Sequence, residues 1–279
     1  MNNKDPEVIY MVVKRTDTDD LGFRFHTGPT VDETLHSIRT LRNYHPDIRV
    51  YVYTDIPRLH LIPAWKELGD ISFMPVGVER EEVLFPHENL WEKNKWQIPD
   101  LRLLFAKLDC MILHPGQALF LDSDTEVCAP LDEIFDSDDV WMHAKEFLFR
   151  ESTYKELLTT VSWPPWGIDP NHVRDYWMIN SGVVWVPWRY RMLLLAAKRW
   201  MISNAYTHVG SSGSNRLKEQ IALSCFFQAK TDGVRTSGHL INHLWWRRGS
   251  YGKHHLGGDD GEQWRWYPPV VHVKKAPKE

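Results

Sequence analysis

Apolar and polar residues follow the order strand, helix, strand in the first part of the chain. A continuous apolar run at Val8–Val13 predicts a strand that is covered on both faces. Capping-box spacing at Thr30–Glu33 and a helical repeat of apolar residues over 31–41 predict a helix. Alternation over Ile48–Thr54 predicts a second strand, which ends at Asp55. This βαβ unit predicts a parallel sheet that binds ligands at the carboxyl ends of its strands.

The same kind of pattern continues toward the middle of the chain. Ile71–Val76 predicts a third strand, and Leu101–Leu108 predicts a helix that leads into the next strand. That strand is the most informative segment, because Ala118–Glu126 reads A-L-F-L-D-S-D-T-E. A short apolar run that ends in two acids predicts a buried strand with carboxylates at its exposed end.

Beyond Pro130 the pattern becomes less regular. Val140–His143 predicts a further strand, and the Trp- and Pro-rich segment Trp163–Gly167 predicts a loop. Arg189–Ile202 predicts a helix, and a second helix follows a Gly/Ser loop and ends near Phe227. No linker composition separates the two parts of the chain, so we expect one domain over residues 1–279.

Asp122 and Asp124 are the first candidates for chemistry. Two carboxylates one residue apart repel each other unless a positive charge lies between them. Mg²⁺ and Mn²⁺ prefer such oxygen ligands and commonly bind together with phosphates. We therefore predict a metal and diphosphate site, and the alternative is a strand-to-turn transition capped by two solvated acids.

Composition limits the classes of function. A formal net charge of −4 provides no general electrostatic reason to bind nucleic acid or an acidic membrane surface. No apolar stretch has the length of a membrane span. The three cysteines lack metal-type spacing and no signal peptide is apparent, which predicts a soluble cytoplasmic protein with reduced thiols. The 14 tryptophans suit stacking on sugars, but they are also ordinary core residues.

An apolar strand that ends in Asp-x-Asp after a βαβ start resembles the glycosyltransferases of the GT-A fold. These enzymes transfer a sugar from a nucleoside diphosphate to an acceptor, usually with Mn²⁺ or Mg²⁺. Asn180–Val183 resembles their Asn-x-Gly segment, which lines the sugar pocket. Glu219–Leu223 resembles their acid-Gln-x-x-Leu helix start, which faces the reacting carbon of the donor. His272, followed by Lys274 and Lys275, resembles the late histidine and basic residue that hold the metal and the diphosphate.

The resemblance implies an α/β fold, with a Rossmann-like, mostly parallel central sheet flanked by helices in one domain. Residues 1–130 are then the nucleotide-sugar-binding half, and residues 131–279 the acceptor-binding half with the metal and diphosphate segment at its C-terminal end. The chain departs from the His-x-x-Gly-x-x-Lys signature of many relatives because the glycine is absent, which leaves the choice between Lys274 and Lys275 open. The chain also resembles the soluble glycosyltransferases with which large algal viruses (chloroviruses) decorate their capsid protein, one of which transfers xylose with inversion.

The resemblance assigns the metal to three residues. Asp124 binds Mn²⁺ or Mg²⁺ directly, and Asp122 contacts the ribose or reaches the metal through water. His272 completes the metal shell as a neutral imidazole. A histidine between valines is otherwise an ordinary strand residue.

The resemblance also assigns contacts to the donor. Asp55, at the end of the second predicted strand, accepts from the base, or else it forms a turn. Arg102 and the lysines at 274 and 275 neutralise the diphosphate as the glycosidic bond breaks, or else they form a solvated cationic surface. Asn180 and Gln220 hydrogen-bond the donor sugar.

Glu219 is the candidate catalytic residue. It lies in the first turn of a predicted helix, where the positive helix end keeps a carboxylate ionised. It stands where retaining relatives often carry Asp, and the longer side chain favours reaching a substrate proton. We therefore expect Glu219 to deprotonate the acceptor hydroxyl in an inverting reaction, and the alternative is an exposed helix acid. If the product retains configuration, Gln220 takes on more importance than Glu219.

The predicted function is metal-dependent transfer of a sugar from a nucleoside-diphosphate sugar to a hydroxyl of a glycan or glycoprotein. A UDP-sugar is the expected donor, with UDP-xylose as one candidate. Alternatives are a haloacid-dehalogenase-type phosphatase, in which Asp122 attacks phosphorus, and a non-catalytic carbohydrate-binding protein. Tryptophans in Pro- or Gly-rich segments are the candidates for stacking on the acceptor: Trp163, Trp166, Trp245, Trp246, Trp264 and Trp266.

Overall fold

The computed structural model describes the chain over residues 6–13, 27–56, 58–76, 98–151, 155, 157–204, 219–243, 264–266 and 273–275. For residues 27–30, 98–104, 160, 243, 264–266 and 273–275 it describes the backbone alone. The structural statements below concern these residues.

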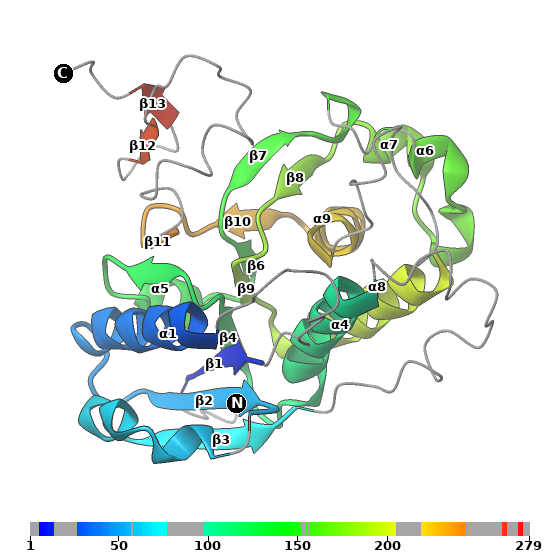
Figure 1. Cartoon of the computed structure of the whole chain (residues 1–279). Helices are drawn as coiled ribbons and strands as arrows, with labels where there is room; N and C mark the ends of the chain where they lie inside the picture. The colour runs from blue at the N-terminus through cyan, green and yellow to red at the C-terminus, as the bar shows by residue number, and fades with distance from the viewer. Residues whose placement is uncertain are drawn as a thin grey trace.

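A seven-stranded sheet forms the centre of the molecule, with the strand order β10-β6-β9-β4-β1-β2-β3 (Figure 1). β9 pairs antiparallel with both of its neighbours, and the other pairs are parallel, so β9 alone among the seven runs in the opposite direction. This confirms the predicted mostly parallel sheet. The strands are β1 (Glu7–Val12), β2 (Arg49–Thr54), β3 (Ile71–Pro75), β4 (Ala118–Leu121), β6 (Val140–Met142), β9 (Val183–Trp185) and β10 (Val234–Thr236).

The predicted βαβ start is confirmed. β1 pairs in parallel with β2, and helix α1 (Thr27–Arg42) connects them. β1 is covered on both faces, because alternate residues enter two different core clusters: Val8 and Tyr10 enter one and Ile9 the other. An apolar run without alternation is the sequence signature of such a strand.

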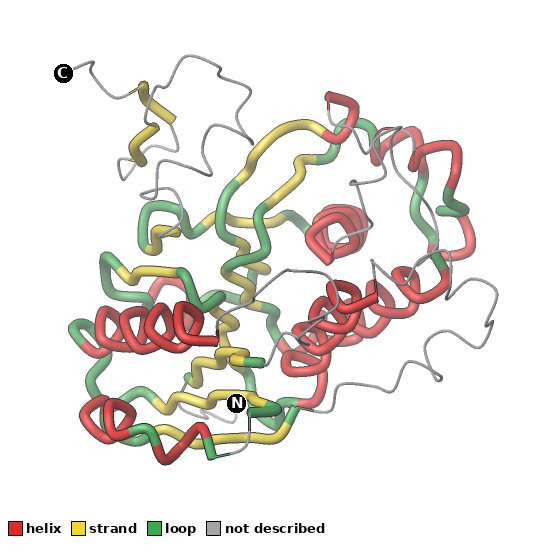
Figure 2. Tube along the Cα trace, in the orientation of Figure 1, coloured by secondary structure: helices red, strands yellow, loops and turns green. Residues whose placement is uncertain are grey.

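Helices cover both faces of the sheet (Figures 1 and 2). α1 packs on one face, whereas α4 (Ile98–Leu113), α8 (Arg191–Ser203) and α9 (Glu219–Lys230) pack together on the other. α4 extends beyond the predicted range 101–108, because the buried residues Cys110 and Met111 continue its apolar face.

Alternation along β4 determines on which face of the sheet the Asp122 side chain lies. Leu119 and Leu121 belong to the core cluster beneath α1, whereas Phe120 belongs to the cluster beneath α4, α8 and α9. Successive side chains of a strand point to opposite faces. The residue after Leu121 therefore continues on the side of α4 and α9.

Smaller elements surround the sheet. Three two-stranded sheets pair β5 (Thr125–Val127) with β11 (Ile241–His243), β7 (Lys145–Leu148) with β8 (Trp177–Ile179), and β12 (Trp264–Trp266) with β13 (Val273–Lys275). The short helices are α5 (Asp132–Phe135), α6 (Leu157–Thr160) and α7 (Pro170–Val173). Within the described ranges, no helix combines the length and apolar character needed to cross a bilayer. None of the three cysteines forms a disulfide.

Most described tryptophans are core residues, and this excludes Trp163 from the candidates for stacking on the acceptor. Trp163 is fully buried and stacks on Trp200, with ring centroids 4.9 Å apart. Its Nε1 donates to the carbonyl of Leu157 at 3.0 Å, so both its face and its donor are used inside the protein. The predicted loop around it contains a short 3-10 helix at Pro164–Trp166. The buried tryptophans are Trp65, Trp141, Trp163, Trp185 and Trp200.

Candidate functional site

The Asp-x-Asp segment forms a turn at the carboxyl end of β4, as predicted. The backbone N–H of Thr125 donates to the Asp122 carbonyl at 3.2 Å, which closes the turn. The N–H of Asp122 donates to the Gly182 carbonyl at 2.8 Å. This second bond places the acidic turn beside the predicted sugar-pocket segment that contains Asn180. Two of the four segments that carried the resemblance therefore meet here.

A buried lysine lies between two of the predicted acids. The Nζ atom of Lys107, on α4, lies 2.9 Å from Oδ1 of Asp122 and 3.2 Å from Oε1 of Glu219. The Lys107 side chain is only 6% exposed, and its Nζ also lies 4.9 Å from the centre of the Phe120 ring. A positive charge beside Asp122 was expected from a metal ion, whereas the protein itself supplies one.

Glu219 begins α9, as predicted, but it is not the exposed helix acid of the alternative interpretation. It is 7% exposed, and its Oε1 accepts from Ser181 Oγ at 2.9 Å as well as from Lys107. The Nζ of Lys107 lies 3.4 Å from the same Ser181 hydroxyl. We call Lys107, Asp122, Ser181 and Glu219 the lysine–carboxylate cluster.

Electrostatics keep Lys107 and Glu219 ionised. Burial by itself would lower the pKa of Lys107, but the carboxylates of Asp122 and Glu219 outweigh burial and raise that pKa. Burial would raise the pKa of Glu219, but the Lys107 charge and the Ser181 hydrogen bond outweigh it and lower that pKa. A carboxylate with a lowered pKa is ionised at neutral pH and is a weaker base.

The two predicted sugar contacts share one acidic partner. The side-chain amide of Gln220 donates to Glu146 Oε2 at 2.7 Å, and that of Asn180 donates to Glu146 Oε1 at 3.2 Å. Oδ1 of Asn180 also accepts from the backbone N–H of Gly182 at 2.8 Å. The helix start, the Asn-x-Gly segment and strand β7 are thus joined next to the lysine–carboxylate cluster.

Asp55 lies at the same edge of the sheet. It is exposed and directly follows β2, at the carboxyl end of that strand, as predicted. β1 separates β2 from β4 in the sheet. Since neighbouring strands lie about 4.8 Å apart, the ends of β2 and β4 are about 10 Å apart across the sheet.

The remaining predicted contacts are described only in part. Arg102 lies in α4, the helix before the acidic turn, as predicted, and its backbone alone is described. Lys274 and Lys275 lie in β13, also with backbone alone. His272 lies outside the described residues, as do Trp245 and Trp246. The meeting of His272 with Asp124 therefore stays a prediction.

The described donor set suits a hard cation but does not complete a site. Asp122 and Asp124 supply carboxylate oxygens, which are the ligands that Mg²⁺ and Mn²⁺ prefer. Among the described residues, no three or more His, Cys, Asp or Glu side chains form a group that could hold a metal ion. The predicted third ligand, His272, is outside that part of the chain.

Sequence reasoning missed three residues of the site: Lys107, Ser181 and Glu146. A signal for Lys107 existed, because it occupies an otherwise apolar helix face three residues before Cys110 and four before Met111. A lysine at a buried position requires a carboxylate partner. Ser181 lies within the Asn180–Val183 segment, and Glu146 has no distinguishing local pattern.

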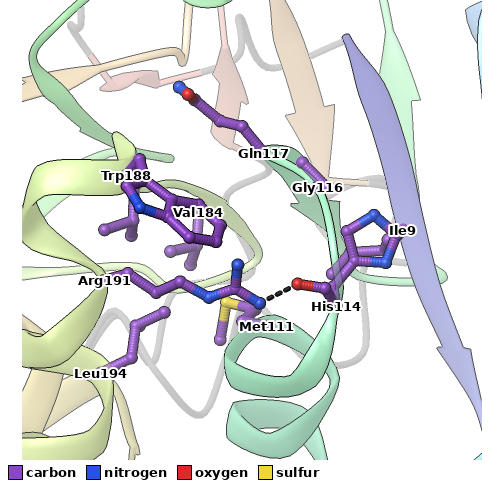
Figure 3. A pocket seen from close by; sticks show the side chains of 11 residues that line it. Ile9, Met111, His114, Gly116, Gln117, Val184, Trp188, Arg191 and Leu194 are labelled. Atoms are coloured by element: carbon purple, nitrogen blue, oxygen red, sulfur yellow. Dashed lines mark hydrogen bonds between the residues drawn. The ribbon is translucent and has the colours of Figure 1, made fainter. Parts of the chain in front are cut away.

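A small cavity of about 20 Å³ lies at the other end of β4 (Figure 3). His114, Gly116, Trp188 and Arg191 are among its lining residues. The Arg191 guanidinium donates to the carbonyls of Ile112 and His114, as the dashed line in Figure 3 shows for His114. Arg191 thereby satisfies carbonyls at the end of α4, which is a structural role. This cavity is separate from the lysine–carboxylate cluster.

The pKa shifts predict how stability depends on pH. The lowered pKa of Glu219 stabilises the fold above the ordinary value of 4.5, and this contribution is lost as pH falls through the lower folded-state pKa. The raised pKa of Lys107 stabilises below its ordinary value of 10.5 and is lost as pH rises through the higher folded-state pKa. We expect the acid decline in unfolding free energy to be shallower in Glu219→Gln, as measured by urea titration at several pH values. An unchanged acid slope would contradict this assignment.

Comparisons with known proteins bear on the fold alone. No protein-family model matches the chain, and no curated protein matches it. Among solved structures, an active-site variant of LgtC aligns with a TM-score of 0.50 and 16% identity over 83% of this chain and 72% of the LgtC chain. Mouse xyloside xylosyltransferase 1 aligns with a TM-score of 0.47 and 13% identity over 90% and 92%.

The LgtC alignment decides the fold. LgtC is described as a galactosyltransferase and was crystallised with donor and acceptor sugar analogues. The chain has the GT-A glycosyltransferase fold. The fold explains why the acidic turn lies at the carboxyl edge of the sheet, where open α/β sheets bind their ligands.

Proposed function

We propose that this protein is a metal-dependent glycosyltransferase that moves a sugar from a nucleoside-diphosphate sugar to an acceptor hydroxyl. The observation that carries the proposal is the lysine–carboxylate cluster at the carboxyl end of β4 in a GT-A fold. Buried charges cost stability unless they are paired, and groups with shifted pKa values at a ligand-binding edge are typical of functional sites.

The cluster joins the two proposed halves of the chain. Lys107 and Asp122 come from residues 1–130, whereas Ser181 and Glu219 come from residues 131–279. We propose that the first half binds the nucleotide sugar and that the second contributes the sugar pocket and the acceptor side. A UDP-sugar is the expected donor, UDP-xylose is one candidate, and a glycan or glycoprotein is the expected acceptor.

The proposed metal ligands are Asp124, Asp122 and His272. When bound, Mn²⁺ or Mg²⁺ would offset the charge of the leaving diphosphate. Asp122 already shares one oxygen with Lys107, which supports a direct metal bond from Asp124 and an indirect role for Asp122. Arg102, Lys274 and Lys275 are proposed to neutralise the diphosphate, and Asp55 to accept from the base.

The amides of Asn180 and Gln220 are proposed to contact the donor sugar. Both amides donate to Glu146, which limits their rotation before a ligand binds. Pre-orientation matters because a loose amide loses rotamer freedom when it binds a hydroxyl.

Glu219 is proposed to act on the acceptor hydroxyl in an inverting reaction. Its ionised state suits a base, whereas its lowered pKa and its bonds to Lys107 and Ser181 weaken it in that role. We expect inversion, which an NMR spectrum of the anomeric proton of the first-formed product would detect. Retention would contradict the base assignment and would leave Glu219 the role of holding Lys107.

A thermal-shift panel of nucleotide sugars, with and without Mn²⁺, tests the proposed function. We expect a UDP-sugar with Mn²⁺ to raise the Tm by about 5 °C, because a ligand bound only by the folded state stabilises it by mass action. EDTA should abolish the shift. The phosphatase alternative predicts no Tm shift with any nucleotide sugar. It also predicts turnover of a generic phosphate ester, which Asp122→Asn would abolish. Glycan binding that is indifferent to EDTA, without UDP binding, would support a carbohydrate-binding protein.

A further inference from the structure

Three buried hydroxyl groups connect β1 and α1 to the acidic turn. Tyr10 Oη lies 3.0 Å from Ser37 Oγ, and Ser37 Oγ lies 2.9 Å from Thr125 Oγ1. Thr125 Oγ1 then donates to the backbone carbonyl of Asp122 at 2.8 Å. All three residues that carry these hydroxyls have an exposed fraction of 0%. We call Tyr10, Ser37 and Thr125 the hydroxyl relay.

The end of the relay determines the direction of every bond. A carbonyl oxygen can only accept, so the Thr125 hydroxyl donates to Asp122. Each hydroxyl has one proton, so Thr125 must accept from Ser37, and Ser37 must accept from Tyr10. The relay therefore has one consistent arrangement, in which each hydroxyl proton has a partner.

A second tie runs from the same helix to the strand after the turn. Thr40 Oγ1, one turn beyond Ser37 on α1, donates to the Ser37 carbonyl at 2.8 Å and accepts from the Val127 N–H at 3.0 Å. α1 is thus bonded to both ends of β5, at Thr125 and at Val127. Helix α1, which is distant in sequence, therefore holds the acidic turn and the strand that follows it.

We propose that Ser37 and Thr125 are positioning residues, which orient the Asp122–Asp124 turn through the hydroxyl relay. Neither side chain is assigned to a ligand. Both act through the backbone carbonyl of Asp122. A turn whose backbone is held by buried bonds also fixes the positions from which its two acidic side chains extend. The consequence for metal and diphosphate binding rests on the proposed function, whereas the positioning of the turn does not.

A matched pair of variants at Thr125 tests the proposal. Thr125→Val keeps the shape and the strand preference but removes the hydroxyl, whereas Thr125→Ser keeps the hydroxyl. We expect Thr125→Val to raise amide hydrogen exchange in the 118–127 segment about tenfold in the ligand-free protein. It should also weaken binding of Mn²⁺ with UDP, measured by calorimetry, by about tenfold. Thr125→Ser should restore both to near the parent values.

Tyr10→Phe is the second variant, in case Thr125→Val does not fold, and Tyr53→Phe is its control. Tyr53 lies in the adjacent strand β2 and is buried, but its hydroxyl bonds to His114 Nδ1 at 3.0 Å, at the other end of the sheet. Tyr10→Phe should raise exchange in the 118–127 segment by a few-fold, whereas Tyr53→Phe should leave it unchanged.

The possible outcomes distinguish a failure of the positioning role from a failure of the proposed function. Unchanged exchange in both Thr125→Val and Tyr10→Phe would overturn the positioning role. Raised exchange with unaltered Mn²⁺ and UDP affinity would overturn its link to ligand binding. If the parent protein itself binds no Mn²⁺ and UDP, the proposed function fails, and exchange still decides whether the relay positions the turn.

Discussion

Replacement of Lys107 by methionine is expected to reduce the free energy of unfolding by about 3 to 5 kcal/mol, because it leaves the buried Glu219 carboxylate and the partly exposed Asp122 carboxylate without their cation. The Lys107 side chain is 6% exposed and the Glu219 side chain 9%, so water cannot replace the lost charge. Methionine is unbranched and of similar length, which keeps the packing term small. Urea unfolding followed by circular dichroism measures the change.

A double-mutant cycle with Glu219→Gln isolates the interaction. We expect the combined variant to lose less stability than the sum of the two single variants, because each change removes the penalty that the other creates. Additive losses would mean that the two side chains do not interact as the structure describes.

Lys198→Met is the matched control for Lys107→Met. Lys198 is also largely buried, and its Nζ lies 2.8 Å from Oδ1 of Asp109, so it joins α8 to α4 through an acid outside the lysine–carboxylate cluster. Both variants should lose stability. Only Lys107→Met should also lower sugar transfer, by about 100-fold, because it removes a preorganised charge at the proposed donor site. Equal activity of the two variants would remove Lys107 from the proposed site.

Asp124→Asn is expected to abolish the Mn²⁺-dependent rise in Tm with a UDP-sugar and to lower transfer about 1000-fold. The amide is neutral and is a poorer ligand for a hard cation than a carboxylate. Since the donor diphosphate is proposed to bind with the metal, nucleotide binding should fall together with Mn²⁺ binding. Calorimetric titration of Mn²⁺ into the UDP-bound protein measures the loss directly.

Asp136→Asn is the control for the loss of one negative charge. Asp136 is exposed and follows α5, away from the acidic turn in sequence. The Asp136→Asn variant should keep the Tm shift and the transfer rate within about twofold of the parent protein, because exposed charges contribute little. If Asp124→Asn behaves like this control, Asp124 is not a metal ligand.

The strands and helices near the N-terminus could be predicted because their signals are local. The apolar run at Val8–Val13 and the alternating run at Ile48–Thr54 match β1 and β2 to within one residue at each end. Each periodicity repeats over a few residues and reports which face of the element is buried. The predicted helix over Leu101–Leu108 is shorter than α4, whose apolar face continues past Leu108.

The site could be predicted only in its individual segments. Asp122, Asn180, Glu219 and Gln220 were found from motifs, and the structure brings them to one edge of the sheet. Lys107 was missed, although its position on an apolar helix face indicates burial, because the sequence does not show that Asp122 and Glu219 are its partners. Trp163 was one of six candidates for stacking on the acceptor, because its local Pro-rich sequence does not reveal that its ring stacks on Trp200.

The sequence by itself determined the order of the elements, the mostly parallel sheet and the acids at the end of β4. Tertiary structure alone decided that β9 runs against its neighbours, that Lys107 forms ion pairs with Asp122 and Glu219, and that α1 holds the acidic turn through hydroxyls. Hydrophobic periodicity records burial over a few residues, so it is readable along the chain. Pairing of charges and hydroxyls depends on packing between distant segments, which no local pattern records.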